Sequence, residues 1–327
     1  MNVLSLFDGM SCGQIALDQL GVKVNNYYAA EIDKYAKQVT KKNYPNTIHL
    51  GDVTQVKGED LPQIDLLMGG SPCQGFSFAG KQLNFDDPRS ALFFEFVRLL
   101  KETNPKYFLL ENVRMKQEYQ DVISEHLGVK PIMINSALMS AQNRVRLYWT
   151  NIPGVEQPKD KGIVLKDILE NFVGDAVKDT DRNKRHYKGV NDKSLCMSAT
   201  MYKGAGNNGM TLVPRPCEPK VLIVNEATKK GYTEIQEGDC FDLTFPNSKT
   251  RRGRNMKDKC NCLTAANYDY MRYEHPTYRK LTPMECERLQ TVPDNYTEGV
   301  SNTQRYKMLG NGWTVGVIKH IFRGLDV

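Results

Sequence analysis

The first 150 residues alternate short apolar runs with amphipathic segments. Apolar runs such as 64–68 predict strands buried in a sheet, whereas apolar residues spaced three and four apart, as in 90–103, predict helices. Strands that alternate with helices are typical of parallel βαβ units. The expected fold class is therefore α/β, with a doubly wound, mostly parallel, Rossmann-like sheet. Strands are expected at 3–7, 24–31, 47–50, 64–68, 107–110 and 131–135, and helices at 13–20, 34–43 and 90–103.

The pattern changes at about residue 159. Residues 178–186 are highly charged, residues 203–209 are typical of a loop, and residues 249–254, a basic run, are typical of a turn. Helical spacing returns only near the C-terminus, at 282–290 and 315–322. Two domains are therefore expected: a larger α/β domain of residues 1–158 plus 305–327, and a smaller, irregular, β-rich domain with its supporting segment at 159–304.

Composition indicates which partners and which compartment to expect. The chain has 327 residues and a formal net charge of +6, which is compatible with a polyanionic partner. No apolar run approaches the roughly 18 residues of a membrane span, and the N-terminus lacks the features of a signal peptide, so a cytoplasmic protein is expected. Eight cysteines in such a protein do not imply disulfides, and neither Cys260 with Cys262 nor the five histidines suggest a metal site.

A cysteine and a carboxyl group follow two successive predicted strands. Cys73 follows the strand at 64–68 in a turn of small residues, where a thiol is presented rather than packed. Glu111 follows the strand at 107–110, so the acid is expected beside the thiol, with an exposed surface acid as the alternative. Such a pair can attack an electron-poor ring and manage the proton on that ring.

Two arginines come later in the same half of the chain. Arg144 and Arg146 are two residues apart and would lie on one face of a strand. They could bind a phosphate, clamp Glu111 or simply be exposed. The pattern itself does not choose between these roles.

The segment after the first predicted strand points to a nucleotide-like ligand. A turn of small residues at 7–13 opens a helix, and such a turn lets a ligand approach the backbone closely. Glu31 ends the second predicted strand, where nucleotide-binding α/β folds place the acid that holds ribose hydroxyls. Asp52 follows the third strand and could accept a hydrogen bond from an adenine amino group. Together these features predict an adenosine-containing ligand, and the lack of a P-loop motif argues against a triphosphate.

These motifs, in this order, resemble those of the DNA (cytosine-5)-methyltransferases. The resemblance covers residues 2–153 and 279–322 and includes SPCQ at 71–74, ENV at 111–113, QNRVR at 142–146, RKLTP at 279–283 and GNGWTV at 310–315. Ser11 and Cys12 stand where two glycines are common, as in the de novo branch of the family. Ile32 stands where an aromatic residue often stacks on adenine, and Gly312 replaces a common serine.

The resemblance implies a reaction. A methyl group passes from S-adenosyl-L-methionine, which leaves as S-adenosyl-L-homocysteine, to C5 of a flipped cytosine in double-stranded DNA through a covalent Cys73–C6 adduct. Glu111 contacts N3 and the exocyclic amine, Arg144 holds the base or Glu111, and Arg146 supports the same site. Cofactor contacts are implied at Phe7, Gly9, Glu31, Ile32, Asp52, Leu92, Asn311 and Trp313. DNA contacts are expected at Gln74 and Ser77 and, from the basic run, at Arg251, Arg252 and Arg254.

Two other functions remain open at this point. One is an RNA cytosine-5 methyltransferase that uses the same fold on transfer RNA, and the other is a catalytically silent DNA-binding accessory protein. The roughly 120 residues at 159–277, with their basic loops, favour DNA, and the intact catalytic residues argue against a silent protein. A microbial or phage enzyme is expected, acting as a monomer in the cytoplasm, or in the host cytoplasm if viral. A cognate restriction endonuclease would be a functional partner without a physical complex.

Overall fold

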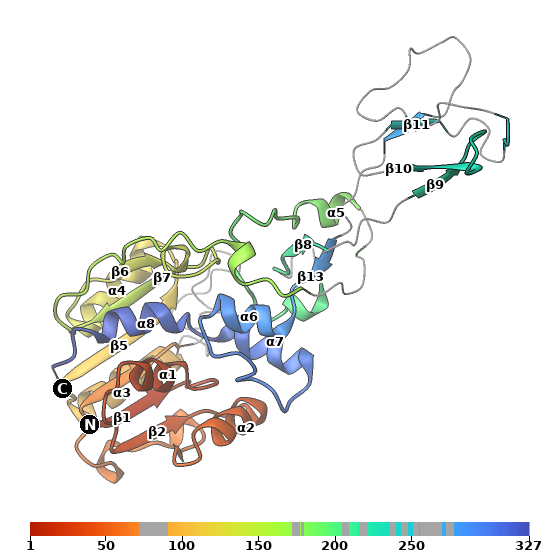
Figure 1. The fold of residues 1–327 in the computed structure, drawn as a ribbon. Helices are drawn as coiled ribbons and strands as arrows, with labels where there is room; N and C mark the ends of the chain where they lie inside the picture. The colour runs from red at the N-terminus through yellow and green to blue at the C-terminus, as the bar shows by residue number, and fades with distance from the viewer. Residues whose placement is uncertain are drawn as a thin grey trace. The chain divides into compact units, whose positions relative to one another are not determined.

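The computed structural model describes residues 1–71, 91–171, 177, 180–204, 209–215, 222–235, 240–242, 248–250, 255, 270–272 and 278–326. Its largest element is a seven-stranded sheet in the order β3-β2-β1-β4-β5-β7-β6 (Figure 1). The first five strands are parallel, and β7 runs antiparallel to both of its neighbours. The predicted α/β class is confirmed. The strands are β1 (Asn2–Leu6), β2 (Asn26–Ala30), β3 (Ile48–His49), β4 (Leu66–Gly69), β5 (Tyr107–Val113), β6 (Ile132–Asn135) and β7 (Val145–Thr150).

Some of the helices begin at a side chain that caps them. Asp33 accepts hydrogen bonds from the backbone N–H groups of Tyr35 and Ala36 at the start of α2. Thr282 and Glu285 form a reciprocal capping box at the start of α6. The helices are α1 (Cys12–Gln19), α2 (Lys34–Asn43), α3 (Ala91–Thr103), α4 (Gln117–Leu127), α5 (Asp181–Lys184), α6 (Pro283–Leu289), α7 (Asn302–Asn311) and α8 (Val315–Phe322).

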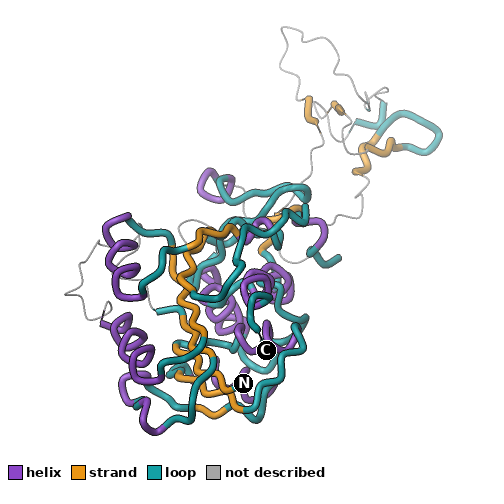
Figure 2. Tube along the Cα trace, turned by 90° about the vertical axis from the view of Figure 1, so that its left-hand side faces the viewer, coloured by secondary structure: helices purple, strands orange, loops and turns teal. Residues whose placement is uncertain are grey.

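Helices lie on both sides of the sheet (Figure 2). On one side, Phe96 of α3 and Ile123 of α4 join Leu4 of β1 in the buried core. On the other side, α1 contacts α8, and Gly13 lets α1 approach the sheet because a Cβ at this position would lie 2.4 Å from the Met68 Cε atom. Because β1 ends at Leu6 and α1 begins at Cys12, the turn between them lies at the carboxyl end of β1.

The chain divides into two compact units. The larger contains Met1–Glu170, Thr180–Val213 and Lys280–Val327, and the smaller contains Asn171–Asp179 and Pro214–Arg279. These bounds differ from the expected ones, because residues 159–170, 180–213 and 280–304 belong to the larger unit. A recognition role for 159–304 stays a prediction. In the smaller unit β9 (Leu222–Asn225) pairs with β10 (Tyr232–Ile235), and β11 (Cys240–Asp242) pairs with β12 (Tyr270–Arg272). Two further short strands, β8 (Leu212–Pro214) and β13 (Tyr278–Lys280), form another pair.

Within the described ranges of the chain, no helix has the length and apolar character needed to cross a bilayer.

Candidate active site

A cavity of about 420 Å³ opens at the carboxyl edge of the sheet, within the larger unit. Its wall includes residues that follow β1, β2, β3 and β4, the last residues of β5, and part of α7 with the turn after it. Residues of α1, α2 and α3 and the two arginines near the start of β7 also line it. This volume lies in the range of small-molecule sites, roughly 300–1,000 Å³. The structure brings all eight predicted cofactor residues to this wall: Phe7, Gly9, Glu31, Ile32, Asp52, Leu92, Asn311 and Trp313.

The turn after β1 has a backbone conformation that few residues adopt. Phe7, Gly9 and Ser11 have φ angles of 57°, 59° and 63°, and such values are strained for residues other than glycine. The Ser11 hydroxyl donates a hydrogen bond to Asp8, which also accepts one from the Tyr27 hydroxyl at 2.7 Å. The buried carboxyl group thus holds a serine in the conformation that a glycine would adopt freely.

Burial changes the ionisation of two side chains in this turn. It raises the pKa of Asp8 to about 6, although Ser11 and Tyr27 donate hydrogen bonds to the carboxylate. Burial likewise raises the pKa of Cys12 to about 12, against a hydrogen bond from the Trp313 backbone. Cys12 lines the cavity but is a neutral thiol at neutral pH, so it cannot supply a thiolate there.

One side of the cavity presents a fixed carboxylate next to an apolar surface. Glu31 accepts hydrogen bonds from the backbone N–H groups of Gly9 and Asp33, both at 2.7 Å. The next side chain, Ile32, is 73% exposed although it is apolar. Asp52 also lines this side, and one of its oxygens accepts from the Thr54 backbone at 3.0 Å. The arrangement offers acceptors for hydroxyl and amino groups beside a surface that a flat ring could cover.

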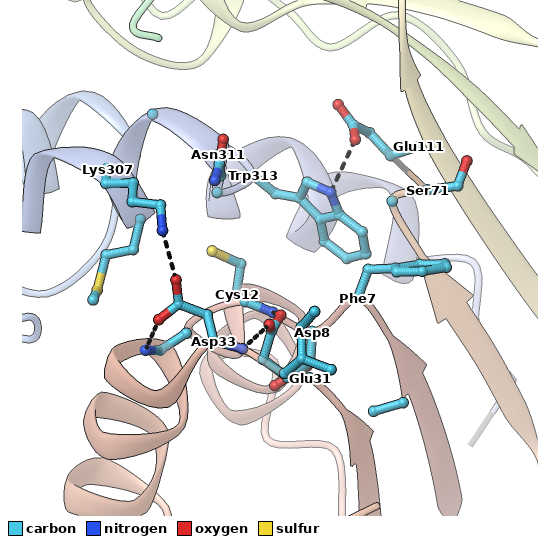
Figure 3. A pocket seen from close by; sticks show the side chains of 18 of the residues that line it. Phe7, Asp8, Cys12, Glu31, Asp33, Ser71, Glu111, Lys307, Asn311 and Trp313 are labelled. Carbon is cyan, nitrogen blue, oxygen red and sulfur yellow. Dashed lines mark hydrogen bonds and ion pairs between the residues drawn. The ribbon is translucent and has the colours of Figure 1, made fainter. Parts of the chain in front are cut away.

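Glu111 lies on the opposite part of the wall, at the end of β5, and is only 8% exposed. Its two carboxylate oxygens have separate donors. The Arg146 Nε atom of β7 lies 2.9 Å from Oε1. The Trp313 Nε1 atom donates to Oε2 at 3.0 Å (Figure 3). Glu111 is therefore a buried, oriented carboxyl group and not the surface acid that the sequence left open.

The two arginines do not act as a pair on one strand face. β7 begins at Val145, so Arg144 precedes the strand. The Arg144 guanidinium donates to the Gly310 carbonyl at 3.2 Å and to the Gly312 carbonyl at 2.9 Å. Arg146 is the residue that contacts Glu111. Of the two implied roles of Arg144, contact with Glu111 is therefore made by Arg146 instead. Arg144 holds the backbone on either side of Asn311.

Several cavity residues escaped the sequence analysis. Asp8 and Cys12 lie in the first turn between residues whose role was predicted, but their importance depends on burial, which the sequence does not show. Lys307 of α7 also lines the cavity and forms an ion pair with Asp33 at 2.8 Å. This contact joins residues 274 positions apart, and no local signal predicts it. The remaining members from α7 are Gln304 and Met308.

Some predicted site residues lie outside the described residues. These are Cys73, Gln74, Ser77, Arg251, Arg252 and Arg254. The described chain reaches Ser71, two residues before the predicted nucleophile. Because β4 and β5 are neighbouring parallel strands, Ser71 lies beside Asn112, whose Nδ2 atom is 3.2 Å from the Ser71 hydroxyl. Ser71 and Glu111 both line the cavity.

The mostly parallel sheet, with a cavity at its carboxyl edge, is a Rossmann-like fold, and solved structures of methyltransferases share this fold. The Entamoeba histolytica methyltransferase EhMeth superposes with a TM-score of 0.69 at 17% identity, over 100% of this chain and 99% of that chain. A mutant of the DNMT2 protein of Spodoptera frugiperda gives a TM-score of 0.66 at 19% identity, over 99% and 98% of the two chains.

The family follows from the sequence comparison. A family model described as C-5 cytosine-specific DNA methylase matches residues 1–326, and the chain belongs to this family of DNA (cytosine-5)-methyltransferases. It is similar to the type II methyltransferase M1.ScrFI of Lactococcus lactis subsp. cremoris, at 31% identity over 98% of this chain and 76% of the relative. It is also similar to the type II methyltransferase M.NlaIV of Neisseria lactamica, at 33% identity over 97% of each chain.

Proposed function

We propose that Cys73 and Glu111 carry the methylation of C5 of a flipped cytosine in double-stranded DNA, with S-adenosyl-L-methionine held in the cavity. One observation supports this assignment above the others. The Glu111 carboxylate lies on the wall of the same cavity that gathers the eight predicted cofactor residues. The acid and the cofactor residues thus meet at the carboxyl edge of one sheet, where α/β enzymes place their chemistry.

The side chains of the cavity fit S-adenosyl-L-methionine. The Glu31 carboxylate, fixed by two backbone amides, is placed to accept from ribose hydroxyls. The exposed Ile32 side chain offers an apolar surface for the adenine ring, and Asp52 offers an acceptor for the adenine amino group. When bound, this cofactor supplies a methyl group on a sulfonium centre and leaves as S-adenosyl-L-homocysteine. The remaining predicted contacts are Phe7, Gly9, Leu92, Asn311 and Trp313.

The protein's own groups perform the covalent step on the base. The Cys73 thiolate adds to C6 of cytosine, and the electrons of the C5–C6 double bond move to make C5 nucleophilic. Glu111 contacts N3 and the exocyclic amine and favours this addition. After C5 has been methylated, loss of its proton restores the double bond and expels the Cys73 sulfur, so that free enzyme and 5-methylcytosine result.

Substrate access sets the remaining requirements. C6 cannot be reached inside a duplex, so the base must flip out, which costs a few kcal/mol. We assign DNA contacts to Gln74, Ser77 and the basic run at 249–254. The relatives include proteins named type II and orphan methyltransferases. We infer a monomer that acts in the cytoplasm, with any cognate restriction endonuclease sharing its DNA sequence without binding it.

The Cys73→Ser variant tests the proposal directly. A serine hydroxyl has far too high a pKa to supply an anion without a dedicated base, so methyl transfer is expected to be abolished. Cofactor affinity, measured by calorimetry, should be kept. Transfer of a labelled methyl group is measured with duplex DNA and with transfer RNA side by side. On duplex DNA that carries 5-fluorocytosine, the wild type should stay covalently attached because C5 then has no proton to lose.

The outcomes separate the three functions. The proposal is supported if the wild type methylates duplex DNA and the Cys73→Ser variant does not. Methylation of transfer RNA but not DNA would identify the RNA enzyme, and methylation of neither would identify a silent protein. Substantial turnover by Cys73→Ser would rule out covalent catalysis through this residue.

A further inference from the structure

The contact between Trp313 and Glu111 is not explained by a cofactor role for Trp313 alone. The indole N–H donates to Glu111 Oε2 at 3.0 Å, while Arg146 Nε lies 2.9 Å from Oε1. The two donors belong to different parts of the chain, since Arg146 lies in β7 and Trp313 follows α7. Figure 3 shows the indole nitrogen directed at the Glu111 carboxylate, while the indole lines the cavity. One side chain therefore touches both the acid and the cofactor space.

Gly70, three residues before the predicted nucleophile Cys73, leaves room for this contact. Gly70 has no side chain, and a Cβ at this position would lie 2.9 Å from Trp313 Nε1 and 3.0 Å from Glu111 Oε2. Its φ angle is not positive, so backbone conformation does not require glycine here. The requirement for glycine comes from the space that the indole and the carboxylate occupy.

The backbone on either side of Trp313 is held from several directions. The Gly312 carbonyl accepts from Arg144 at 2.9 Å and from Gln290 at 3.0 Å. The Thr314 hydroxyl is 2.8 Å from the Ser136 hydroxyl and also donates to Gln290 at 2.8 Å. The indole is therefore positioned by the protein and does not depend on a ligand for its place.

We propose that Trp313 is a positioning residue for Glu111: its indole N–H fixes the carboxylate in the plane that the flipped cytosine must meet. The inference rests on the proposed function of Glu111. With Arg146 on one oxygen and Trp313 on the other, rotation about the last side-chain bond of Glu111 is blocked before the base arrives. A carboxyl group that is already oriented loses no further freedom when it contacts the base. Arg144 contributes indirectly, because it anchors the Gly312 backbone next to Trp313.

The Trp313→Phe variant separates positioning from cavity lining. Phenylalanine keeps an aromatic surface toward the cavity but has no N–H donor. A lost hydrogen bond to a charged group is expected to lower the single-turnover methyl-transfer rate by about 10- to 100-fold. The dissociation constant for S-adenosyl-L-homocysteine, measured by calorimetry, should change by less than about threefold, because ring contacts remain. In a Glu111→Gln background the same change should lower the rate by less than about twofold, since both residues act through one carboxylate.

A measurement without cofactor or turnover gives an independent readout. The chain has two tryptophans, and subtracting the spectrum of Trp313→Phe isolates the emission of Trp313. Replacing the charged acceptor by Glu111→Gln should change this emission in the free protein. The matched control is Trp149→Phe. Trp149 is fully buried, does not line the cavity, and donates a hydrogen bond of 3.0 Å to the Ser124 hydroxyl. This control should leave the methyl-transfer rate unchanged.

Three results would overturn the positioning role. One is a wild-type rate in Trp313→Phe, and another is a Trp313 emission that does not respond to Glu111→Gln. Equal losses of rate and of cofactor affinity in Trp313→Phe would also overturn it, because they would assign the indole to cofactor binding alone. An inactive wild-type protein would instead contradict the proposed function, and the emission experiment would still decide whether the indole and the carboxylate are coupled.

Discussion

Asp8 is a partly buried acid on which the geometry of the first turn depends. Hydrogen bonds from Ser11 and Tyr27 reach its carboxyl group, but burial dominates and raises its pKa from 3.8 to about 6. The folded state therefore binds this proton more tightly than the unfolded state. It follows that the contribution of Asp8 to stability is largest below about pH 4 and falls as the pH rises through about 6.

The Asp8→Asn variant tests this linkage because it keeps the size of the side chain and removes its ionisation. The free energy of unfolding of the wild type relative to the variant should fall by about 1 kcal/mol between pH 5 and pH 7, and by about 3 kcal/mol over the whole titration. Urea unfolding at the two pH values measures the difference. The control is Asp181→Asn, whose carboxyl group is fully exposed. A pH-independent difference for Asp8→Asn would show that Asp8 does not titrate in this range.

Residues of the site were predictable where a motif coincides with a strand end. Glu31 and Glu111 each follow an apolar run, and the rule that ligands bind beyond the carboxyl ends of parallel strands places them in one cavity. The partners of the arginines were not predictable in this way. Arg146 and Arg144 are two residues apart, yet one reaches Glu111 and the other the Gly312 carbonyl, because β7 begins between them.

At the scale of elements, α6 and α7 are joined by a buried ion pair. Glu287 of α6 is fully buried, and its Oε1 atom lies 2.9 Å from the Arg305 guanidinium of α7. The same carboxylate accepts from the backbone N–H groups of Asn295 at 2.7 Å and Thr297 at 2.8 Å, which lie in the loop between the helices. This network determines where α7 places Lys307 against the cavity.

Removing one partner of this pair should be costly. In Glu287→Ala the Arg305 charge loses its partner and two backbone donors lose their acceptor, so the free energy of unfolding should fall by about 3–5 kcal/mol. Urea unfolding at neutral pH gives the value. Asp294→Ala is the matched control, because it removes a partly exposed pair with Arg288 from the same region and should cost less than about 1 kcal/mol. Equal losses in the two variants would contradict a dominant role for the buried pair.

Three helices of the described structure, α4, α5 and α7, were not predicted. The four-residue α5 lies in the charged segment at 178–186, and the reasons for α4 and α7 differ. In α4 the buried residues Tyr119, Ile123 and Leu127 are spaced four apart, which is a helical signal that could have predicted the element. In α7 only Met308, Leu309 and Gly310 at the C-terminal end are buried. A helix with so little apolar surface has no strong periodicity, and its position depends on the contact with Glu287.

At the scale of the whole molecule, the change of pattern at residue 159 did not mark the boundary of a compact unit. Residues 180–213 belong to the larger unit because their contacts return to it. The Lys193 ammonium donates to the carbonyls of Ala137 and Ile163, both at 2.6 Å, and the Met197 carbonyl accepts from Arg144 at 3.0 Å. Such contacts between side chains and distant carbonyls leave no trace in composition. The boundary that composition predicts at residue 159 therefore lies before the end of the first segment of the larger unit, at Glu170.

The chain has a formal net charge of +6. We expect the basic run at 249–254 to contact DNA. The sequence places Arg251 and Arg252 within four basic residues of six, a set whose charges favour contact with phosphates. Replacing both arginines by alanine should weaken binding to every duplex and reduce the slope of log affinity against log salt by about 2. If one arginine instead reads a guanine, its loss should cost about 1–3 kcal/mol at the cognate sequence only.

Affinity measured over a series of salt concentrations, with cognate and unrelated duplexes, separates the two roles. Lys229→Ala with Lys230→Ala, in the exposed turn between β9 and β10, removes the same charge and should leave the slope nearly unchanged. If the two double variants behave alike, or if the arginine variant keeps wild-type affinity, slope and site preference, the run is a solvated surface.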